Sequence, residues 1–226
     1  MQEIMRKSGQ SKYVPALGYD FLTPCYDAVV GLTGRERTVK QALVKQAGLA
    51  RGQQVLDLAC GTGTLAILIK KHQPGVALSG VDGDRKVLSI AARKVQKAQV
   101  QARFHQALSF ALPYSEARFD RVLSSMFFHH LAWDDKVRTV REVYRVLKPG
   151  AEFHVADWGA AANRLMRGLF LTVQLLDGFT NTRDHVSGRM PALFTDNGFS
   201  DVSQRQTINT IYGTIALFSA TKPVQP

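Results

Sequence analysis

Cysteine is scarce in this sequence, acidic residues are outnumbered by basic ones, and no long apolar run occurs. The 226 residues include two cysteines, Cys25 and Cys60, which are too few for a disulfide framework or a four-cysteine zinc site. No stretch of about 18 apolar residues is present, so no segment is expected to span a membrane. Because the N-terminal segment also lacks the apolar core of a signal peptide, the expected location is the cytoplasm.

The deficit of acidic residues leaves a strongly basic chain. Its 29 Lys and Arg against 18 Asp and Glu give a formal net charge of +11. The densest basic cluster lies in a segment with the apolar spacing of a helix and comprises Arg85, Lys86, Arg93, Lys94 and Lys97. A solvated helix face is the favoured interpretation, and contact with anionic lipid or nucleic acid is the alternative, since positive potential attracts both. We expect at most weak contact with an anionic membrane surface and no specific nucleic-acid partner.

The composition and the order of the apolar runs predict a globular α/β protein. Apolar residues make up 45% and charged residues 21% of the chain, which excludes wholesale disorder. Strands are expected at 53–59, 76–82, 101–106, 118–125 and 151–157, and helices at 14–30, 35–49, 64–72, 85–98 and 135–147. Strands that alternate with helices indicate a parallel sheet that helices cover on both faces.

The end of the chain breaks this alternation. Residues 160–180 are apolar and aromatic and are expected to form a helical insertion, followed by a short helix over 190–197. Two strand-like runs, 201–208 and 211–220, are close enough in sequence to pair antiparallel. The prediction is therefore an α/β sandwich whose mostly parallel seven-stranded sheet carries an antiparallel C-terminal edge hairpin.

A glycine-rich turn, ACGTG, follows the first predicted strand and lets the backbone approach a ligand closely. Read as G-x-G-x-x-A, the turn offers Gly61, Gly63 and Ala66 to a dinucleotide, with Asp82 as the ribose-binding acid. Asp57 favours a different ligand, because a carboxylate at the end of the strand repels a pyrophosphate. It suits a ligand that has an ammonium group and no phosphate, such as S-adenosylmethionine.

Several motifs around this turn resemble those of the class I S-adenosylmethionine-dependent methyltransferases. VLDLACGTG at 55–63 resembles their first motif, and GVDGD at 80–84 resembles their second. FDRVLSSMFFHHL at 119–131 and REVYRVLKPGAEFHVAD at 141–157 resemble their fourth and fifth strands with the helix between. The resemblance covers residues 50–160 closely and implies a Rossmann-like three-layer sandwich that uses S-adenosylmethionine.

The same resemblance implies which residues hold the cofactor. The methionine moiety is expected to contact Asp57, Ala59, Gly61, Gly63, Ser124 and Ser125. The nucleoside is expected to contact Asp82 and Gly83, and Tyr26 of the N-terminal segment is a further cofactor-binding residue. Leu108 stands where many relatives carry an Asp that accepts from the adenine amino group. Since Leu108 offers only its backbone, Ser109 or the main chain would have to make that contact. Cys60 is interpreted as a small filler of the turn.

Methyl transfer from a sulfonium needs an aligned acceptor, exclusion of water and in some cases a base. The residues expected to face the acceptor follow the fourth and fifth strands or lie in the N-terminal segment: His129, His130, Asp157, Trp158, Tyr19 and Tyr26. His130 and Tyr19 are the candidate catalytic groups, and packing at the strand exit is the alternative role of the histidine pair. Leu169 and Phe170 are expected to form or support the wall of an apolar acceptor pocket.

The resemblance implies one domain over 1–226. Its parts are an N-terminal helical lid over 1–50, a cofactor-binding core over 51–160, a substrate-side insertion over 161–200 and the hairpin over 201–226. The stretch YDFLTPCYD resembles the lid of relatives that methylate quinones, lipid headgroups and other small molecules. The residues HHL and ADWG differ from those typical of the quinone-ring enzymes, which makes the quinone alternative less favoured.

The expected function is transfer of the methyl group of S-adenosylmethionine to a small, partly apolar acceptor through its nitrogen, oxygen or carbon. Three alternatives stay open: an RNA methyltransferase that uses the basic surface, a quinone or phospholipid-headgroup methyltransferase at a membrane, and a cofactor-binding partner without activity. The set Asp57, Gly61, Gly63 and Asp82 disfavours the last of these. No metal is expected.

Overall fold

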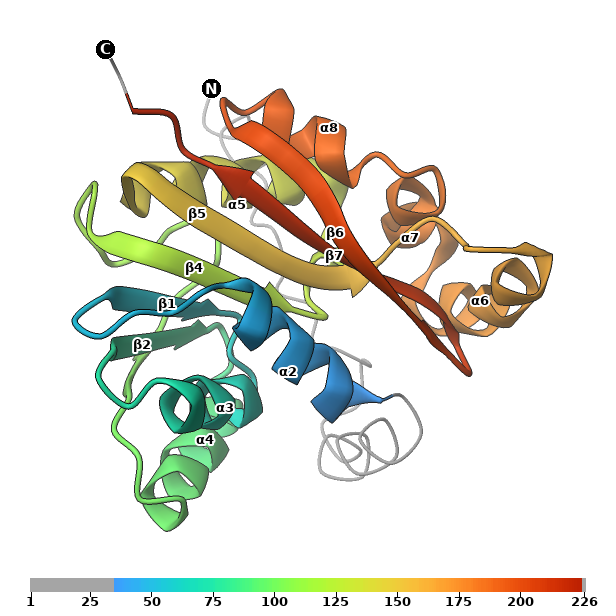
Figure 1. Ribbon diagram of the computed structural model, residues 1–226. Helices are drawn as coiled ribbons and strands as arrows, with labels where there is room; N and C mark the ends of the chain where they lie inside the picture. Colours follow the sequence, from blue (N-terminus) through green and yellow to red (C-terminus); the bar gives the residue numbers. More distant parts are fainter. Residues whose placement is uncertain (1–34, 225–226) are drawn as a thin grey trace, which may run out of the picture.

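A computed structural model describes residues 35–224 of the chain (Figure 1). Its elements, in chain order, are α2 Glu36–Gln46, β1 Gln54–Leu58, α3 Thr64–His72, β2 Ala77–Asp82, α4 Arg85–Lys97, β3 Arg103–Gln106, β4 Phe119–Ser125, the 3₁₀ turn η1 Phe128–His130, α5 Trp133–Val146, β5 Leu147–Trp158, α6 Arg164–Asp177, α7 Phe179–Val186, α8 Met190–Thr195, β6 Ser200–Thr210 and β7 Gly213–Thr221. The seven predicted strands all form, and the helix predicted over 64–72 has the expected bounds.

Part of the prediction falls outside the described residues. The helix expected over 14–30, with Tyr19, Cys25 and Tyr26, belongs to this part. In the described part of the chain, no helix combines the length and the apolarity needed to cross a membrane.

The seven strands form one sheet in the order β3-β2-β1-β4-β5-β7-β6. Strands β1 to β5 pair parallel, whereas β7 pairs antiparallel with both β5 and β6. The strand order reverses between β1 and β4, and this topological switch lies beside the glycine-rich turn. The predicted Rossmann-like sandwich with an antiparallel C-terminal hairpin is confirmed.

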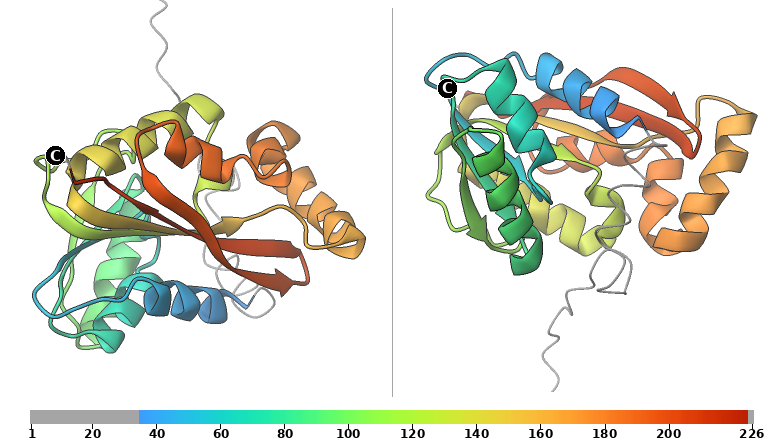
Figure 2. Two further views of the ribbon diagram at one scale, coloured as in Figure 1. Left: turned by 45° about the horizontal axis from the view of Figure 1, so that its top comes forward. Right: turned by 90° about the horizontal axis from the view of Figure 1, so that it is seen from below.

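Helices cover both faces of the sheet (Figure 2). α2, α3 and α4 lie on one face, and α5 and α8 lie on the other. An apolar core lies on each face of the sheet, and successive residues of β1 point into one core and then the other. Val55 packs in the core of Leu43 and Ile69, whereas Leu56 packs in the core of Val140. Because side chains alternate along a strand, an apolar run is buried on both faces.

Side-chain caps fix where two helices near the site begin. The Asp84 carboxylate accepts hydrogen bonds from the backbone N–H groups of Lys86 and Val87 at the start of α4. The Asn163 side chain accepts from the N–H of Met166 at the start of α6. Such caps satisfy N–H groups that have no partner within the helix, so the loops that precede these helices are held in place.

Two details differ from the prediction. β5 begins at Leu147, directly after α5, and a register shift opposite Phe119 and Arg121 absorbs the Pro149-Gly150 turn into the strand. The insertion forms two helices instead of one, because Gly178 (φ 89°) ends α6 and α7 follows at once. Both helices lie beyond the carboxyl end of β5 (Figure 1).

Candidate functional site

Polar residues from neighbouring strands meet at one edge of the sheet. Asp57 pairs in register with Gly80 of β2 and Leu123 of β4. One or two residues farther along, β4 reaches Ser124 and β2 ends at Asp82. Ligands of open α/β sheets bind outside the carboxyl ends of the strands at a topological switch, so this edge is the candidate site.

The turn between β1 and α3 has a backbone that most residues avoid. Ala59 (φ 55°), Gly61 (φ 53°) and Gly63 (φ 78°) are all left-handed. The two glycines serve different purposes, because a Cβ on Gly63 would lie 3.0 Å from the Cβ of Ala91, whereas a Cβ on Gly61 would meet nothing within 4 Å. Gly63 is therefore needed for helix packing, and Gly61 borders open space that a ligand can occupy.

A lysine from α4 fixes this turn from outside. Lys94 Nζ donates hydrogen bonds to the hydroxyl oxygens of Thr62 at 2.9 Å and Thr64 at 2.8 Å. The turn is also closed by hydrogen bonds from Cys60 N to Val81 O at 2.9 Å and from Gly63 N to Cys60 O at 3.0 Å. These contacts hold the strained turn in a single arrangement, as is common where backbone strain accompanies function.

Three buried polar atoms at the switch lack a hydrogen-bond partner among the described residues. They are Asp57 Oδ2, Ser124 Oγ and Ser125 Oγ. Burial raises the pKa of Asp57 to about 7, although the nearby Lys40 ammonium and a hydrogen bond from the N–H of Ala66 favour the charged form. Buried polar atoms without partners are costly. Because side chains alternate along β4, Ser125 shares the sheet face of Asp57 and Ser124 points to the opposite face, so one ammonium group can meet Asp57 and Ser125.

Asp82 is held between the glycine-rich turn and the start of α4. Its Oδ2 accepts from Gly61 N at 3.0 Å and its Oδ1 accepts from Asp84 N at 3.0 Å. Burial raises its pKa, and these two hydrogen bonds oppose the increase. The backbone of β3 continues past it, since Ala107 N donates to Asp82 O, and the next residue, Leu108, is exposed. Asp82 therefore lies in a fixed position at the edge of open space.

A second polar centre lies at the end of β5. Asp157 is fully buried and accepts four hydrogen bonds: from Phe127 N and Phe128 N to Oδ2, and from Trp158 N and His129 Nδ1 to Oδ1. Burial opposes its ionisation, yet the neighbouring imidazoles and these hydrogen bonds hold the pKa of Asp157 below its usual range. An ionised carboxylate only accepts, so Nδ1 of His129 carries the proton of this hydrogen bond.

Two more imidazoles surround His129. The ring of His130 lies 4.0 Å from it, centroid to centroid, and the ring of His185 from α7 lies 6.3 Å away. Burial, followed by the charge of His129, lowers the pKa of His130 to about 3. His185 Nδ1 donates to Trp158 O at 2.7 Å, while its buried Nε2 lacks a hydrogen-bond partner among the described residues. His130 is thus neutral at physiological pH. The rings of His130 and His185 both lie close to the ring of His129.

A buried ion pair attaches α7 to α5. Lys136 of α5 is fully buried, and its Nζ donates to Asp184 Oδ2 at 2.7 Å and to Asn181 O at 2.7 Å. Breaking a buried pair of this kind leaves an uncompensated charge. The contact therefore holds α7, with its His185, against the end of β5.

The insertion packs on the aromatic end of β5. Phe170 of α6 is 3% exposed, and its ring lies 5.3 Å from the Trp158 ring, centroid to centroid. Leu169 is half-buried beside it. α6 therefore packs on Trp158, and the role of Leu169 and Phe170 as the wall of an acceptor pocket stays a prediction.

Comparison with known proteins identifies the family. Residues 55–150 match the family described as methyltransferase domain. Over 140 residues the chain is 35% identical to demethylmenaquinone methyltransferase of Thermus thermophilus, a match that covers 62% of this chain and 60% of the relative. It is 32% identical over 179 residues to an uncharacterized methyltransferase of Synechocystis, covering 70% of this chain and 81% of that protein. The chain belongs to the class I S-adenosylmethionine-dependent methyltransferases.

The solved structures agree with this family in fold. A SAM-dependent methyltransferase from Methanosarcina mazei superimposes with a TM-score of 0.63 at 20% identity, over 78% of this chain and 95% of that one. The matches with the demethylmenaquinone methyltransferases of Thermus thermophilus, Deinococcus radiodurans and Lactiplantibacillus plantarum cover 60%, 62% and 57% of those proteins. This methyltransferase therefore spans about three fifths of the length of these relatives.

The methyltransferase brings most of its sequence-predicted residues to the two centres described above. Ser109 differs, because its buried hydroxyl lies 2.8 Å from the hydroxyl of Thr139 on α5. That hydroxyl is engaged with a helix, which leaves the main chain near Leu108 as the group available to an adenine. Gly83 O accepts from Gln106 Nε2 at 3.1 Å, so its loop is fixed as well.

Some residues of these centres carry no signal in the sequence. In the sequence, Lys94 is one member of a basic cluster and Lys136 is one of several charged residues of an amphipathic helix. His185 lies in α7, and the apolar pattern does not distinguish this short helix from the rest of the insertion. Only the packing of α4, α5 and α7 brings these three side chains to the sheet edge.

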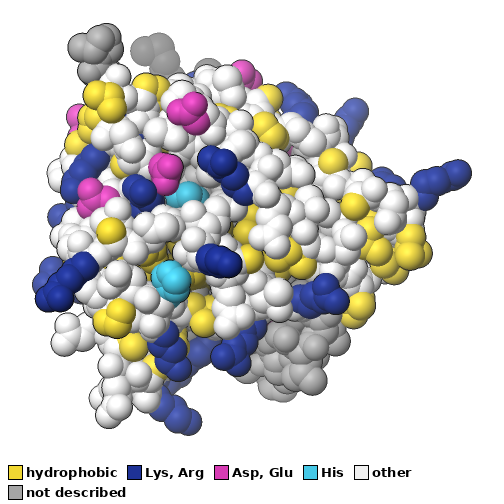
Figure 3. Space-filling view, viewed as in Figure 1, with side chains coloured by type: hydrophobic (Ala, Val, Ile, Leu, Met, Phe, Trp, Pro, Cys, Tyr) yellow, Lys and Arg dark blue, Asp and Glu magenta, His cyan; other side chains and the backbone are white. Residues whose placement is uncertain are grey.

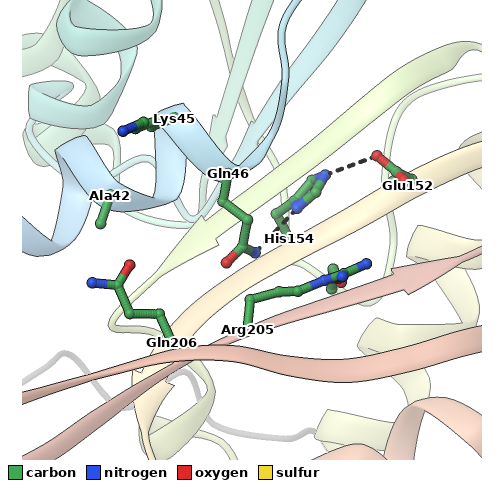
Figure 4. Close-up of a pocket in the computed structure, with 8 residues that line it drawn as sticks. Ala42, Lys45, Gln46, Glu152, His154, Arg205 and Gln206 are labelled. Atoms are coloured by element: carbon green, nitrogen blue, oxygen red, sulfur yellow. Dashed lines mark hydrogen bonds and ion pairs between the residues drawn. The ribbon is translucent and has the colours of Figure 1, made fainter.

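Other features of the methyltransferase lie apart from this edge. Within residues 35–224, no group of three His, Cys, Asp or Glu could hold a metal ion. A polar hollow of about 560 Å³ lies between α2 and the hairpin, where Gln46 points toward His154 and Arg205 lines the hairpin side (Figure 4). His154 lies three residues before the end-of-strand Asp157, and its ring nitrogens are within 3.3 Å of Gln46 Nε2 and Glu152 Oε2.

Proposed function

We propose that this protein transfers the methyl group of S-adenosylmethionine to a small, partly apolar acceptor. The observation that carries the proposal is the pair of unpartnered buried atoms on one face of the sheet, Asp57 Oδ2 and Ser125 Oγ, beside the open space at Gly61. An amino-acid ammonium fits this place, and a pyrophosphate does not, because Asp57 would repel it. The same set of atoms disfavours a dinucleotide.

Different residues of the chain are proposed to bind different parts of the cofactor. Bound S-adenosylmethionine supplies a methyl group on a positively charged sulfur, ready for in-line displacement. Asp57 and the backbone at Ser124 and Ser125 hold the ammonium end, and the backbone of Ala59 and Gly61 borders the methionine moiety. Asp82, fixed by two N–H groups, meets the ribose hydroxyls, and Gly83 and the main chain near Leu108 border the adenine.

The acceptor side supplies alignment and a hydrogen-bond acceptor for a departing proton. When a carbon–sulfur bond breaks and a bond from methyl to acceptor forms, the sulfonium charge disappears and the acceptor loses its proton. His130 is the proposed group beside this proton; its pKa of about 3 lets the neutral imidazole accept a hydrogen bond from the acceptor, while the proton itself passes on to solvent, and His129 is held by Asp157 at 2.7 Å. The side chains of Trp158 and Phe170 make the acceptor side of the site apolar. Tyr19, the second catalytic candidate, lies outside the described residues.

The first acceptor to test is a reduced naphthoquinone ring. Relatives named demethylmenaquinone methyltransferase and 2-phytyl-1,4-beta-naphthoquinone methyltransferase motivate this choice, together with the aromatic residues Trp158 and Phe170 at the site.

We also propose that the protein works in the cytoplasm, in line with the free, buried thiol of Cys60.

A transfer assay tests the proposal. The purified chain is incubated with S-adenosylmethionine labelled in its methyl group and, separately, with reduced naphthoquinone, amine, phospholipid and RNA fractions. Label is expected in an apolar small molecule, and Asp57→Asn is expected to reduce its incorporation. Label that enters RNA alone, or equal incorporation by the Asp57→Asn variant, would contradict the proposal.

A further inference from the structure

One end of the molecule exposes an unusual amount of apolar surface. Of the seven large apolar side chains that are exposed in residues 35–224, five lie on α6, at the start of α7 or at the tip of the hairpin: Leu165, Leu171, Leu175, Phe179 and Ile211. Leu165 is 68% exposed and Leu175 is 73% exposed. Single exposed leucines are ordinary, whereas a contiguous apolar patch marks an interaction site.

Helix α6 is apolar on both of its sides. Its inner side buries Met166, Phe170 and Val173 against the end of the sheet. Its outer side carries Leu165 and Leu175 at helical spacing, where a surface helix normally carries charge. The outer leucines contribute nothing to the core, so their retention in an exposed position calls for a partner.

The hairpin tip continues this surface. A Cβ on Gly213, at the start of β7, would lie 3.1 Å from the ring of Phe170. Ala162 N, just before α6, donates to the Thr214 hydroxyl at 3.1 Å. The turn with Ile211 therefore adjoins α6. We call Leu165, Leu171, Leu175, Phe179 and Ile211 together the α6 patch.

Positive charge borders the α6 patch. Arg164 at the start of α6 and Arg183 on α7 are exposed, whereas Asp184 is buried against Lys136. Figure 3 shows apolar side chains gathered at the α6 end of the molecule, with Lys and Arg side chains at their border. The basic helix α4 lies at the other end of the molecule (Figures 1 and 2), so this border is a separate feature.

We propose that the α6 patch docks this protein on the surface of an anionic lipid bilayer. An apolar helix face with a basic border lies in the plane of a membrane interface, where burial of apolar side chains and attraction to anionic lipid act together. Phe170 links the inner side of α6 to Trp158 at the acceptor site. Docking here would bring the acceptor site of the proposed function close to the bilayer, although the docking itself does not depend on methyl transfer.

Co-sedimentation of the full chain with vesicles tests this inference. Phosphatidylcholine vesicles with phosphatidylglycerol are expected to bind the protein at least about tenfold more tightly than phosphatidylcholine alone, and high salt should remove most of the difference. The double variant Leu165→Ser/Leu175→Ser should weaken binding at least about tenfold, since two exposed leucines leave the interface. Val224→Ser is the matched control, because Val224 is 71% exposed outside the α6 patch, and it should bind as the wild type does.

A second pair of variants tests the charge. Arg164→Ser/Arg183→Ser should weaken binding to anionic vesicles, whereas Arg93→Ser/Lys97→Ser on α4 should leave it nearly unchanged. Unaltered vesicle binding by Leu165→Ser/Leu175→Ser, or a loss confined to the α4 variant, would overturn the inference. So would light scattering that shows a dimer which Leu165→Ser/Leu175→Ser dissociates, with no binding to vesicles. Affinity for S-adenosylhomocysteine should be unchanged in all of these variants, so failure of docking is distinguishable from failure of the proposed function.

Discussion

Replacing Asp57 by Asn tests the cofactor site most sharply, because it removes a charge and keeps the shape of the side chain. Asp57 is 1% exposed, and its Oδ2 atom has no hydrogen-bond partner within residues 35–224. A hydrogen bond between this carboxylate and the ligand ammonium should be worth about 1.5–3 kcal/mol. At about 1.4 kcal/mol per decade, affinity for S-adenosylhomocysteine should fall roughly ten- to hundred-fold in the variant.

The same substitution should change how stability without ligand depends on pH. The pKa of Asp57 is about 7 in the fold, against an ordinary value of 3.8. Between about pH 4 and pH 7 the folded state holds a proton that the unfolded state has released, so stability falls as the pH rises through this window. At about 1.36 kcal/mol per pH unit, the wild type should lose up to about 4 kcal/mol relative to Asp57→Asn.

Titration calorimetry with S-adenosylhomocysteine and thermal melts, both near pH 6 and near pH 8, measure the two effects. Wild-type affinity should rise with pH, because the ionised carboxylate binds the ammonium, and the affinity of Asp57→Asn should depend less on pH. Asp120→Asn is the control, because Asp120 lies at the amino end of β4 and pairs with Lys148 at 2.7 Å. An Asp57→Asn variant with wild-type affinity, or one that melts lower than the wild type near pH 8, would refute the reasoning.

Three further changes test other parts of the site. Gly63→Ala should destabilise the fold by about 1–2 kcal/mol in urea unfolding, because the left-handed backbone strains the new residue and its Cβ would lie 3.0 Å from Ala91. Asp82→Ala should weaken S-adenosylhomocysteine binding at least about tenfold in calorimetry while the melting temperature stays close to that of the wild type; unchanged affinity would place the ribose elsewhere. His130→Ala should lower the rate of methyl transfer by a similar factor from pH 6 to pH 9, since a pKa of about 3 keeps the imidazole neutral throughout; a loss that appears only above pH 7 would contradict this.

The cofactor half of the site could be predicted from the sequence because neighbouring residues supply it. Asp57 and the glycines of the turn lie within seven residues of one another in the chain, and Asp82 ends the next strand. In a parallel sheet, adjacent strands must bring their carboxyl ends together, so a correct strand order already places Asp57 near Asp82. The fold itself follows from the same alternation of strands and helices.

The acceptor half could be predicted only in part. Asp157 and Trp158 end β5 and His129 follows β4, but the contact of His129 with Asp157 depends on how the 3₁₀ turn η1 folds back. Lys136 and His185 come from helices whose apolar pattern does not say which polar side chain will face inward. Gly178 divides the insertion because of its backbone angle, which the apolar pattern of residues 160–180 does not reveal.

Ligand-dependent melting of the full chain tests the central claim, a site at the β1–β4 switch for a ligand with an ammonium group and no phosphate. S-adenosylhomocysteine should raise the melting temperature, because a ligand that binds only the folded state stabilises it by mass action. NADH, whose pyrophosphate the Asp57 carboxylate repels, should leave the melting temperature unchanged. A shift with NADH alone, or equal shifts with both ligands, would contradict the account.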